Sequence, residues 1–250
     1  VLPAAVLALA AVFVFAVLPE LHYASASQLL KDGQFDEAAE AFTRLGNYRD
    51  ARDMIAETRY QEGLWLLEQG KFDRAADIFE SLDDYRDAAI QVQETKYRKG
   101  LSFIDSGKYD EAVALLKSLG DYRDAADQIN EALYQKGVSL SEAGAFDEAL
   151  AIFTELSGYK DSVEQISAIH YQRGKALLMS GEYMEAIRQL SLVPDYEDAN
   201  SLLRQCRLKM AHNCITAGTG FTAAIMQNKA RCTSYLILPN MATWPTLIDI

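Results

Sequence analysis

Apolar residues recur along the chain at the spacing of amphipathic α-helices. The segment after Asp124 shows this spacing, with apolar or small side chains at Ala125, Ile129, Ala132, Leu133, Val138 and Leu140. Steps of three and four residues are typical of a helix and unlike the alternation of a strand. A second amphipathic stretch runs from Phe146 to Leu156. The pattern predicts a long helix of roughly 20 residues, a turn at Gly144 and a shorter helix of about 11.

This unit recurs every 37 residues. The period is marked by glycines at the predicted turn, namely Gly33, Gly70, Gly107, Gly144, Gly181 and Gly218. All but the last open the phrase Gly-x-aromatic-x-x-Ala. Two tyrosine series keep the interval, Tyr23, Tyr60, Tyr97, Tyr134, Tyr171 and Tyr48, Tyr85, Tyr122, Tyr159, Tyr196, the second always followed two residues later by Asp. A strict period of this size predicts a repeat array, in which stacked neighbours bury each unit's apolar stripe.

Two further features of the unit carry structural predictions. Asp121 precedes the long helix and is predicted to cap it, as are Asn47, Asp84 and Asp195, with Gly158 in the fourth unit. The Asp of each Tyr-x-Asp motif is expected to assist this capping, and its tyrosine to pack between units. Glycines inside the long helices, Gly63, Gly100, Gly137 and Gly174, each cost about 1 kcal/mol relative to alanine. Their recurrence predicts that a neighbouring helix approaches too closely for a β-carbon.

The second unit, Tyr60-x-x-Gly63…Gly70-x-Phe72-x-x-Ala75-x-x-x-Phe79-x-x-Leu82, resembles a tetratricopeptide repeat. The likeness covers about residues 20–200, with a period of 37 instead of the usual 34. The usual proline after the second helix is missing except at Pro194. These departures resemble a divergent subset found in bacterial membrane-anchored proteins. The resemblance implies an all-α, right-handed α-solenoid of helix-turn-helix repeats that binds a protein or peptide in its concave face.

The first residues predict a different element. Val1 to Leu18 carry no charge, and a helix of that length reaches roughly 27 Å against a hydrocarbon core of about 30 Å. We therefore predict a transmembrane helix over residues 1–19. A signal peptide cleaved near Ala24-Ser25-Ala26, giving a secreted protein, and a buried soluble helix are the alternatives. The flank after Leu18 is poor in Lys and Arg, which favours an extracytoplasmic array.

The repeat array is predicted over residues 20–218, followed by a degenerate last repeat and irregular tail over 219–250. Phe221-Thr222-Ala223-Ala224-Ile225 still resembles the start of a second helix, but the pattern is lost after about Arg231. A divergent cap, a truncated or frameshifted reading frame and a partner-docking tail remain three open interpretations of this segment.

Composition argues against nucleic-acid binding, and the scattered reactive residues give no support for catalysis or for cofactor or metal binding. The net charge of −12 and pI near 4.7 argue against binding nucleic acid and favour basic partners. Cys206, Cys214 and Cys232 form no disulfide framework, and Cys206 is expected to be a small buried residue. The scattered histidines, His22, His170 and His212, and the Gly218-Thr219-Gly220 turn point to no catalytic, cofactor or metal site.

The candidate partner-binding residues are the helix tyrosines and their basic neighbours, namely Tyr60, Tyr97, Tyr134, Tyr171, Lys99, Lys136 and Arg173. One interpretation has the tyrosines packing between adjacent helices. The other has them lining a concave groove, where the basic residues meet a peptide carboxylate. The Lys and Asn of the family's carboxylate clamp are absent here, so that clamp is not transferred.

The sequence thus predicts a non-catalytic, membrane-anchored scaffold for protein or peptide binding, and no enzyme. The alternatives are a superhelical accessory arm of a larger cell-envelope enzyme and a purely structural spacer. Fold analogy does not choose among them, and it does not fix the oligomeric state.

Overall fold

The computed structural model describes residues 13–218, which form helices and contain no β-strand. A short π-helical turn, η1 (Phe13–Val17), leads into eleven α-helices: α2 (Leu18–Lys31), α3 (Phe35–Leu45), α4 (Ala51–Glu68), α5 (Phe72–Glu80), α6 (Ala88–Asp105), α7 (Tyr109–Lys117), α8 (Ala125–Glu142), α9 (Phe146–Glu155), α10 (Ser162–Ser180), α11 (Tyr183–Leu190) and α12 (Ala199–Gly218). They divide into two compact units, one ending at Lys136 and the other beginning at Gly137.

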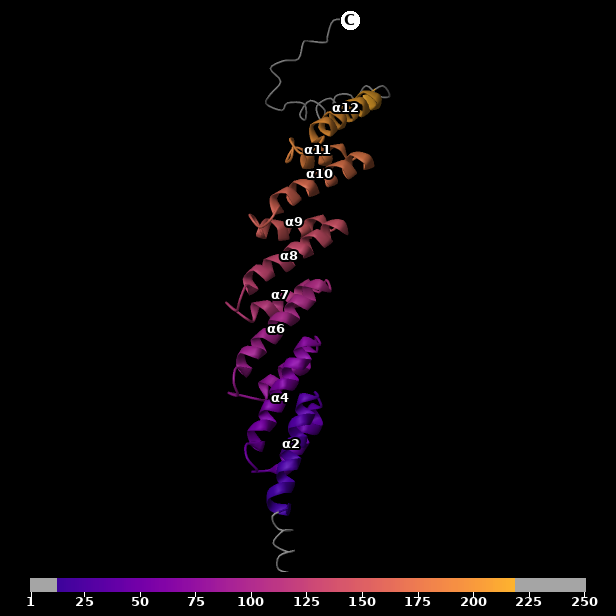
Figure 1. Cartoon of the computed structure of the whole chain (residues 1–250). Coiled ribbons are helices and arrows are strands. Elements are labelled where there is room, and N and C mark those ends of the chain that lie inside the picture. Colours follow the sequence, from indigo (N-terminus) through magenta and orange to yellow (C-terminus); the bar gives the residue numbers. More distant parts are fainter. Residues whose placement is uncertain (1–12, 219–250) are drawn as a thin grey trace, which may run out of the picture. The chain divides into compact units, whose positions relative to one another are not determined.

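Long and short helices alternate, and each packs against the next in the chain. In the first unit α2 contacts α3, α3 contacts α4, and the series continues to α7 (Figure 1). In the second unit α9 packs on α10, α10 on α11 and α11 on α12. A long helix therefore contacts the short helix of its own repeat and that of the preceding repeat. This confirms the predicted all-α array of helix-turn-helix repeats.

The turn between the two helices of a repeat is made by glycine in the left-handed conformation. Gly70 has φ +70° and Gly107 has φ +74°. Gly107 donates its backbone N–H to the carbonyl of Ile104, which lies in the last turn of α6. Glycine adopts this conformation without the steric cost that a β-carbon would add. The predicted helix-ending role of these residues is confirmed.

Glycines inside the long helices lie against large side chains of the following short helix. A β-carbon on Gly63 would lie 2.8 Å from the ring of Phe79, and one on Gly100 would lie 2.8 Å from Leu116. The same relation joins Gly137 to Phe153 at 2.9 Å and Gly174 to Leu190 at 2.5 Å. The close approach predicted from the recurring glycines is thus confirmed, and its partner is always the residue 16 positions later.

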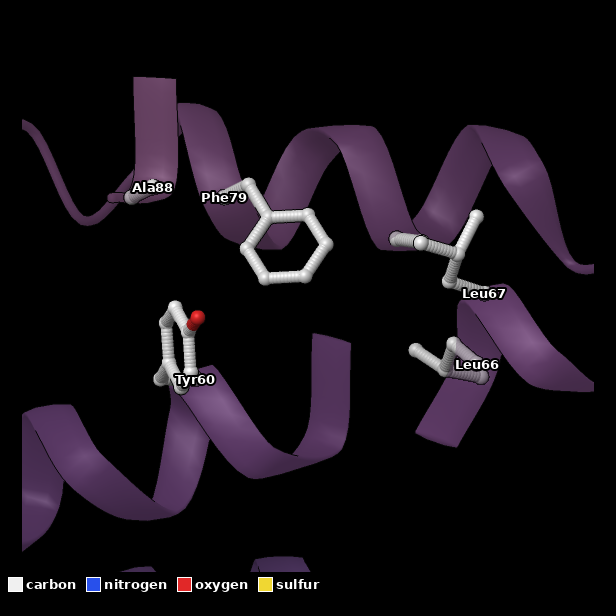
Figure 2. Packing of buried hydrophobic residues seen from close by; sticks show 6 residues of the cluster. Tyr60, Leu66, Leu67, Phe79 and Ala88 are labelled. Atoms are coloured by element: carbon white, nitrogen blue, oxygen red, sulfur yellow. The ribbon is translucent and has the colours of Figure 1, made fainter. Parts of the chain in front are cut away.

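The core of a repeat consists of aromatic and aliphatic side chains from both helices. In the second repeat, Tyr60, Leu66 and Leu67 of α4 meet Phe79 of α5 (Figure 2). The rings of Tyr60 and Phe79 have their centroids 5.8 Å apart at an interplanar angle of 68°. Ala88, the first residue of α6, closes the cluster. Each repeat therefore completes its core with the start of the next repeat.

The predicted start of the long helices is wrong by several residues. Asp84 and Asp121 lie in turns, and the helices begin at Ala88 and Ala125. The N-cap residue is instead the Asp of the Tyr-x-Asp motif, as in Asp50 and Asp87, and its side chain makes no cap hydrogen bond. The first helical N–H is bonded by the backbone carbonyl of the motif's tyrosine. The carboxylate is therefore free to bond elsewhere.

Parts of the predictions lie outside the described residues. The hydrophobic helix over 1–19 is described only from Phe13, and the segment 219–250 is not described. Gly218 ends α12, so its turn also lies outside. Among the helices of residues 13–218, none has the length and hydropathy required to span a bilayer.

Candidate functional site

The candidate tyrosines lie on the long helices, where they are partly or fully covered. Tyr60 in α4 and Tyr97 in α6 are only 6% and 7% exposed. Tyr134 in α8 and Tyr171 in α10 are half-buried. In the two buried cases the ring is covered by the loop that enters the next long helix.

At the junction of the second and third repeats, five side chains form an interlocking arrangement that we term the tyrosine clamp. The hydroxyl of Tyr60 donates to Asp87 at 2.5 Å, and that of Tyr85 donates to Glu57 at 2.7 Å. Arg86 forms an ion pair with Glu57 at 2.8 Å. Its guanidinium also lies 5.3 Å from the centroid of the Tyr60 ring. Two residues of one helix are thus tied to three residues of the next loop.

The clamp repeats at the other two junctions of the first unit. Its members there are Glu20, Tyr23, Tyr48, Arg49 and Asp50, and then Glu94, Tyr97, Tyr122, Arg123 and Asp124. The helix tyrosine donates to the aspartate at 2.6 Å in both. The ion pair of arginine and glutamate measures 2.8 Å in both. Three copies with nearly equal distances indicate that the 37-residue period preserves this contact.

The arginine of each clamp has a strained backbone. Arg49, Arg86 and Arg123 have φ between 49° and 50°, a region that costs an L-residue roughly 1–2 kcal/mol. In this conformation the side chain lies over the tyrosine ring and reaches the glutamate. A cation over an aromatic face contributes about 0.5–1 kcal/mol at exposed sites, and the ion pair adds to it. The clamp contacts therefore offset most of the backbone strain.

The last junction of the second unit retains only half of the clamp. Tyr171 still donates to Asp198 at 2.5 Å. However, Glu197 stands at the arginine position, with φ 46°, and Ala168 stands at the glutamate position. Both partners of the ion pair are thus replaced together, which avoids a pair of like charges.

Burial and hydrogen bonding shift the titration of the clamp residues. Burial of the ring, followed by the hydrogen bond to Asp124, raises the pKa of Tyr97 to about 12. The same two causes raise the pKa of Tyr60 to about 12. The bond from Tyr97 in turn holds the pKa of the Asp124 carboxyl below its usual value. At neutral pH Tyr97 is therefore a neutral phenol that donates to the ionised carboxylate of Asp124.

The candidate basic residues form ion pairs between repeats. Lys99 pairs with Asp73, Lys136 with Asp110 at 2.6 Å, and Arg173 with Asp147 at 2.6 Å. Each joins a long helix to the first turn of the preceding short helix. The aspartates are 75–83% exposed, whereas the basic side chains are 28–32% exposed. The role of these residues and of the tyrosines in partner binding stays a prediction.

Reasoning from the sequence missed the glutamates of the clamp. Glu20, Glu57, Glu94 and Glu131 also keep the 37-residue interval, three residues before the first four helix tyrosines. That spacing places both side chains on one helix face, so the signal was present in the sequence. The sequence predicts that the aspartates of the Tyr-x-Asp motif assist capping; they occupy the N-cap position, but their carboxylates accept hydrogen bonds from the helix tyrosines and make no cap hydrogen bond.

The remaining chemistry-bearing residues are not gathered into a site. His170 lies beside Gln189, with its Nδ1 2.9 Å from the amide oxygen. Within the described part of the chain, no three His, Cys, Asp or Glu side chains could hold a metal ion. Cys206 is fully buried, as predicted, and burial raises the pKa of its thiol.

Comparison with known proteins supports the repeat assignment for part of the chain. Residues 97–162 match the family model described as "Tetratricopeptide repeat". This segment begins at Tyr97, inside α6, and extends through α7, α8 and α9 to the first residue of α10. It therefore includes two of the turn glycines, Gly107 and Gly144. Tetratricopeptide repeat domains generally act as scaffolds for protein–protein interaction and are typically non-catalytic. The comparison with curated proteins gives no match.

Two solved structures are similar to the chain at low identity and low TM-score. The TPR domain of P58(IPK) is 14% identical, with 87% of this chain and 75% of that chain covered and a TM-score of 0.29. The TPR-like repeats of a putative kinesin light chain from Podosopora anserina are also 14% identical. There the coverage is 78% of this chain and 95% of that chain, with a TM-score of 0.23. With scores this low, neither structure supports an inference about this chain.

Proposed function

We propose that this chain is a non-catalytic scaffold of tetratricopeptide-like repeats that binds a protein or peptide. The observation that carries the proposal is the family match over residues 97–162, which lies inside an array that keeps one 37-residue unit from Gly33 to Gly181. Stacked helical pairs present a continuous surface assembled from successive repeats, which suits extended partners.

One candidate surface is formed by the basic residues of the long helices, which lie two residues after the helix tyrosines and therefore point to a different side of the helix. Lys99, Lys136 and Arg173 are about one-third exposed. In the proposed complex a peptide carboxylate replaces the exposed aspartate as the partner of each basic side chain, so that the basic side chain keeps a negative partner. Such an exchange would bind an acidic segment without creating an unpaired cation on the array.

The test is affinity capture with the full chain after cross-linking, followed by binding assays with the purified partner. The wild type is compared with a variant in which Lys99, Lys136 and Arg173 are all replaced by methionine. We expect a partner whose affinity falls at least tenfold in the variant while the unfolding transition is retained. Repeated failure to recover any partner that binds the purified chain would contradict the scaffold function.

The proposed scaffold is attached to a membrane through its first residues, with the array on the extracytoplasmic side. Support comes from the uncharged run Val1–Leu18 and from Phe13 and Val14, whose side chains are 50% exposed. Leu9→Arg places a charge inside this run at a cost of about 2.5–3.5 kcal/mol for a spanning helix. We expect the wild type to resist alkaline extraction from membranes and Leu9→Arg to be extracted, with Leu9→Ile as the matched control. Extraction of the wild type would refute the attachment.

A further inference from the structure

A cleft of about 700 Å³ opens in the first unit between the ends of two short helices and the long helix between them. Its walls include Glu80 at the end of α5, the turn residues Asp83 and Asp84, and Lys96 of α6. Apolar side chains also line it. Val92 of α6 and Leu119 after α7 are half-buried there, so the cleft offers apolar contact beside a row of carboxylates.

Asp83 differs from its equivalents in the neighbouring repeats. One period earlier and later the same position is glycine, and Gly46 and Gly120 have φ +60° and +58°. Asp83 adopts φ +46° although it carries a β-carbon. Glycine would adopt this conformation without strain. The second repeat thus tolerates backbone strain that places a carboxylate on the cleft wall.

The charge of the cleft wall is unbalanced. Lys96 is paired with Glu80 at 3.3 Å. In the part of the chain that the structure describes, no ion pair or hydrogen bond engages the side chains of Asp83 and Asp84. A cationic group placed between them would be attracted by both carboxylates, and the net charge of −12 would favour its approach.

We propose that this cleft binds a basic peptide segment of a partner protein. A Lys or Arg side chain of the segment lies against Asp83 and Asp84, and an adjacent apolar side chain contacts Val92 and Leu119. The inference rests on the proposed scaffold function and adds to it a second surface, with a partner chemistry opposite to that expected at Lys99, Lys136 and Arg173.

The experiment uses the full chain and two synthetic probes, a labelled peptide that alternates leucine with lysine and arginine, and its counterpart with glutamate in place of the basic residues. Binding is measured by fluorescence anisotropy. The variants are Asp83→Asn, Asp83→Gly, which restores the residue of the neighbouring repeats, and Asp121→Asn. Asp121 is the equivalent of Asp84 one period later and does not line the cleft, so it controls for the loss of one charge.

We expect the basic probe to bind the wild type in preference to the acidic one. Asp83→Asn and Asp83→Gly should each weaken that binding by about three- to fivefold, the range of one exposed ion pair, whereas Asp121→Asn should not. Asp83→Gly should not lower the melting temperature, since it removes strain.

Three results would overturn the assignment: equal weakening by Asp121→Asn, no effect of either Asp83 variant, or preference for the acidic probe. Self-association of the chain that Asp83→Asn abolishes would place a second copy in the cleft, and would also refute the peptide assignment. In each of these cases a partner captured through Lys99, Lys136 and Arg173 would leave the scaffold function intact.

Discussion

The hydroxyl of Tyr97 in α6 donates a 2.6 Å hydrogen bond to the carboxylate of Asp124, the residue before α8. The two residues lie 27 positions apart and belong to successive repeats. Equivalent bonds join Tyr23 to Asp50 and Tyr60 to Asp87 in the same unit. The bond therefore links repeats, and its removal should act on stability through the interface between neighbours and leave the fold of one repeat unchanged.

Tyr97→Phe removes this bond and keeps the aromatic ring. A hydrogen bond to a charged group contributes about 1.5–3 kcal/mol, and the exposure of Asp124 places the expected loss near the lower end, at about 1–2 kcal/mol. The measurement is urea denaturation followed by circular dichroism. Tyr109→Phe is the matched control, because Phe35, Phe72 and Phe146 occupy its position in other repeats, and the described residues provide no hydrogen-bond partner for its hydroxyl. Equal losses in the two variants would contradict the role of the bond.

The same pair predicts how stability depends on pH. The pKa of Tyr97 is raised to about 12 from an ordinary 10.0, so its contribution is complete below pH 10 and is lost as the pH rises through 12. The lowered pKa of Asp124 gives the opposite dependence: its contribution is complete above its ordinary pKa of 3.8 and is lost as the pH falls below it.

The difference in unfolding free energy between the wild type and Tyr97→Phe should therefore be constant between about pH 5 and 9 and shrink on both sides. Denaturation curves at several pH values measure it. The absorbance of ionised tyrosine provides a second readout, because Tyr97→Phe should remove one group that titrates near pH 12. A difference that grows towards pH 12 would have the wrong sign for this mechanism.

Gly100→Ala should destabilise the array even though alanine favours helices. The new β-carbon would lie 2.8 Å from Leu116. Overpacking of this kind costs about 1–3 kcal/mol, which exceeds the gain in helix propensity of up to about 1 kcal/mol. We expect a net loss of about 1–2 kcal/mol in urea denaturation, whereas Ser102→Ala on the exposed side of α6 should change stability by less than about 0.5 kcal/mol.

A double-mutant cycle identifies the contact responsible. Trimming the neighbour with Leu116→Ala makes room for the β-carbon, so the two changes together should cost less than their sum, with a coupling of at least about 0.5 kcal/mol. Strict additivity, or stabilisation by Gly100→Ala alone, would show that the close approach to Leu116 is not what requires glycine.

Period and amphipathic spacing were enough to predict the helices, the turn glycines and the close contact at Gly100. Each of these features is determined by residues within one 37-residue unit, so the sequence of a single unit is enough to predict it. The first residue of each long helix, and the role of the aspartate before it, could not be predicted in the same way. The Asp of the Tyr-x-Asp motif satisfies the rules for a capping residue, but its carboxylate bonds to a tyrosine 27 residues earlier. A rule for local capping cannot detect a competing partner in the preceding repeat.

The ion pairs between repeats should contribute little to stability, and the chain itself supplies the replacement to test. One period after Asp147 and Arg173 the corresponding positions carry Met184 and Met210. Exposed ion pairs contribute about 0–1 kcal/mol, and Asp147 is 82% exposed. The double replacement Asp147→Met with Arg173→Met should therefore change the free energy of unfolding by less than about 0.5 kcal/mol, and added salt should reduce the wild-type stability only slightly.

Each single replacement should cost slightly more than the double, because it leaves one charge without its partner. Arg188→Met is the control, since Arg188 forms its ion pair with Glu185 inside α11 and therefore within one repeat. Urea denaturation at low and high salt measures all four variants. A loss above about 2 kcal/mol in the double variant would mean that the pair holds successive repeats together. A small loss would leave the basic side chain available to exchange its aspartate for a partner's carboxylate at little cost to the fold.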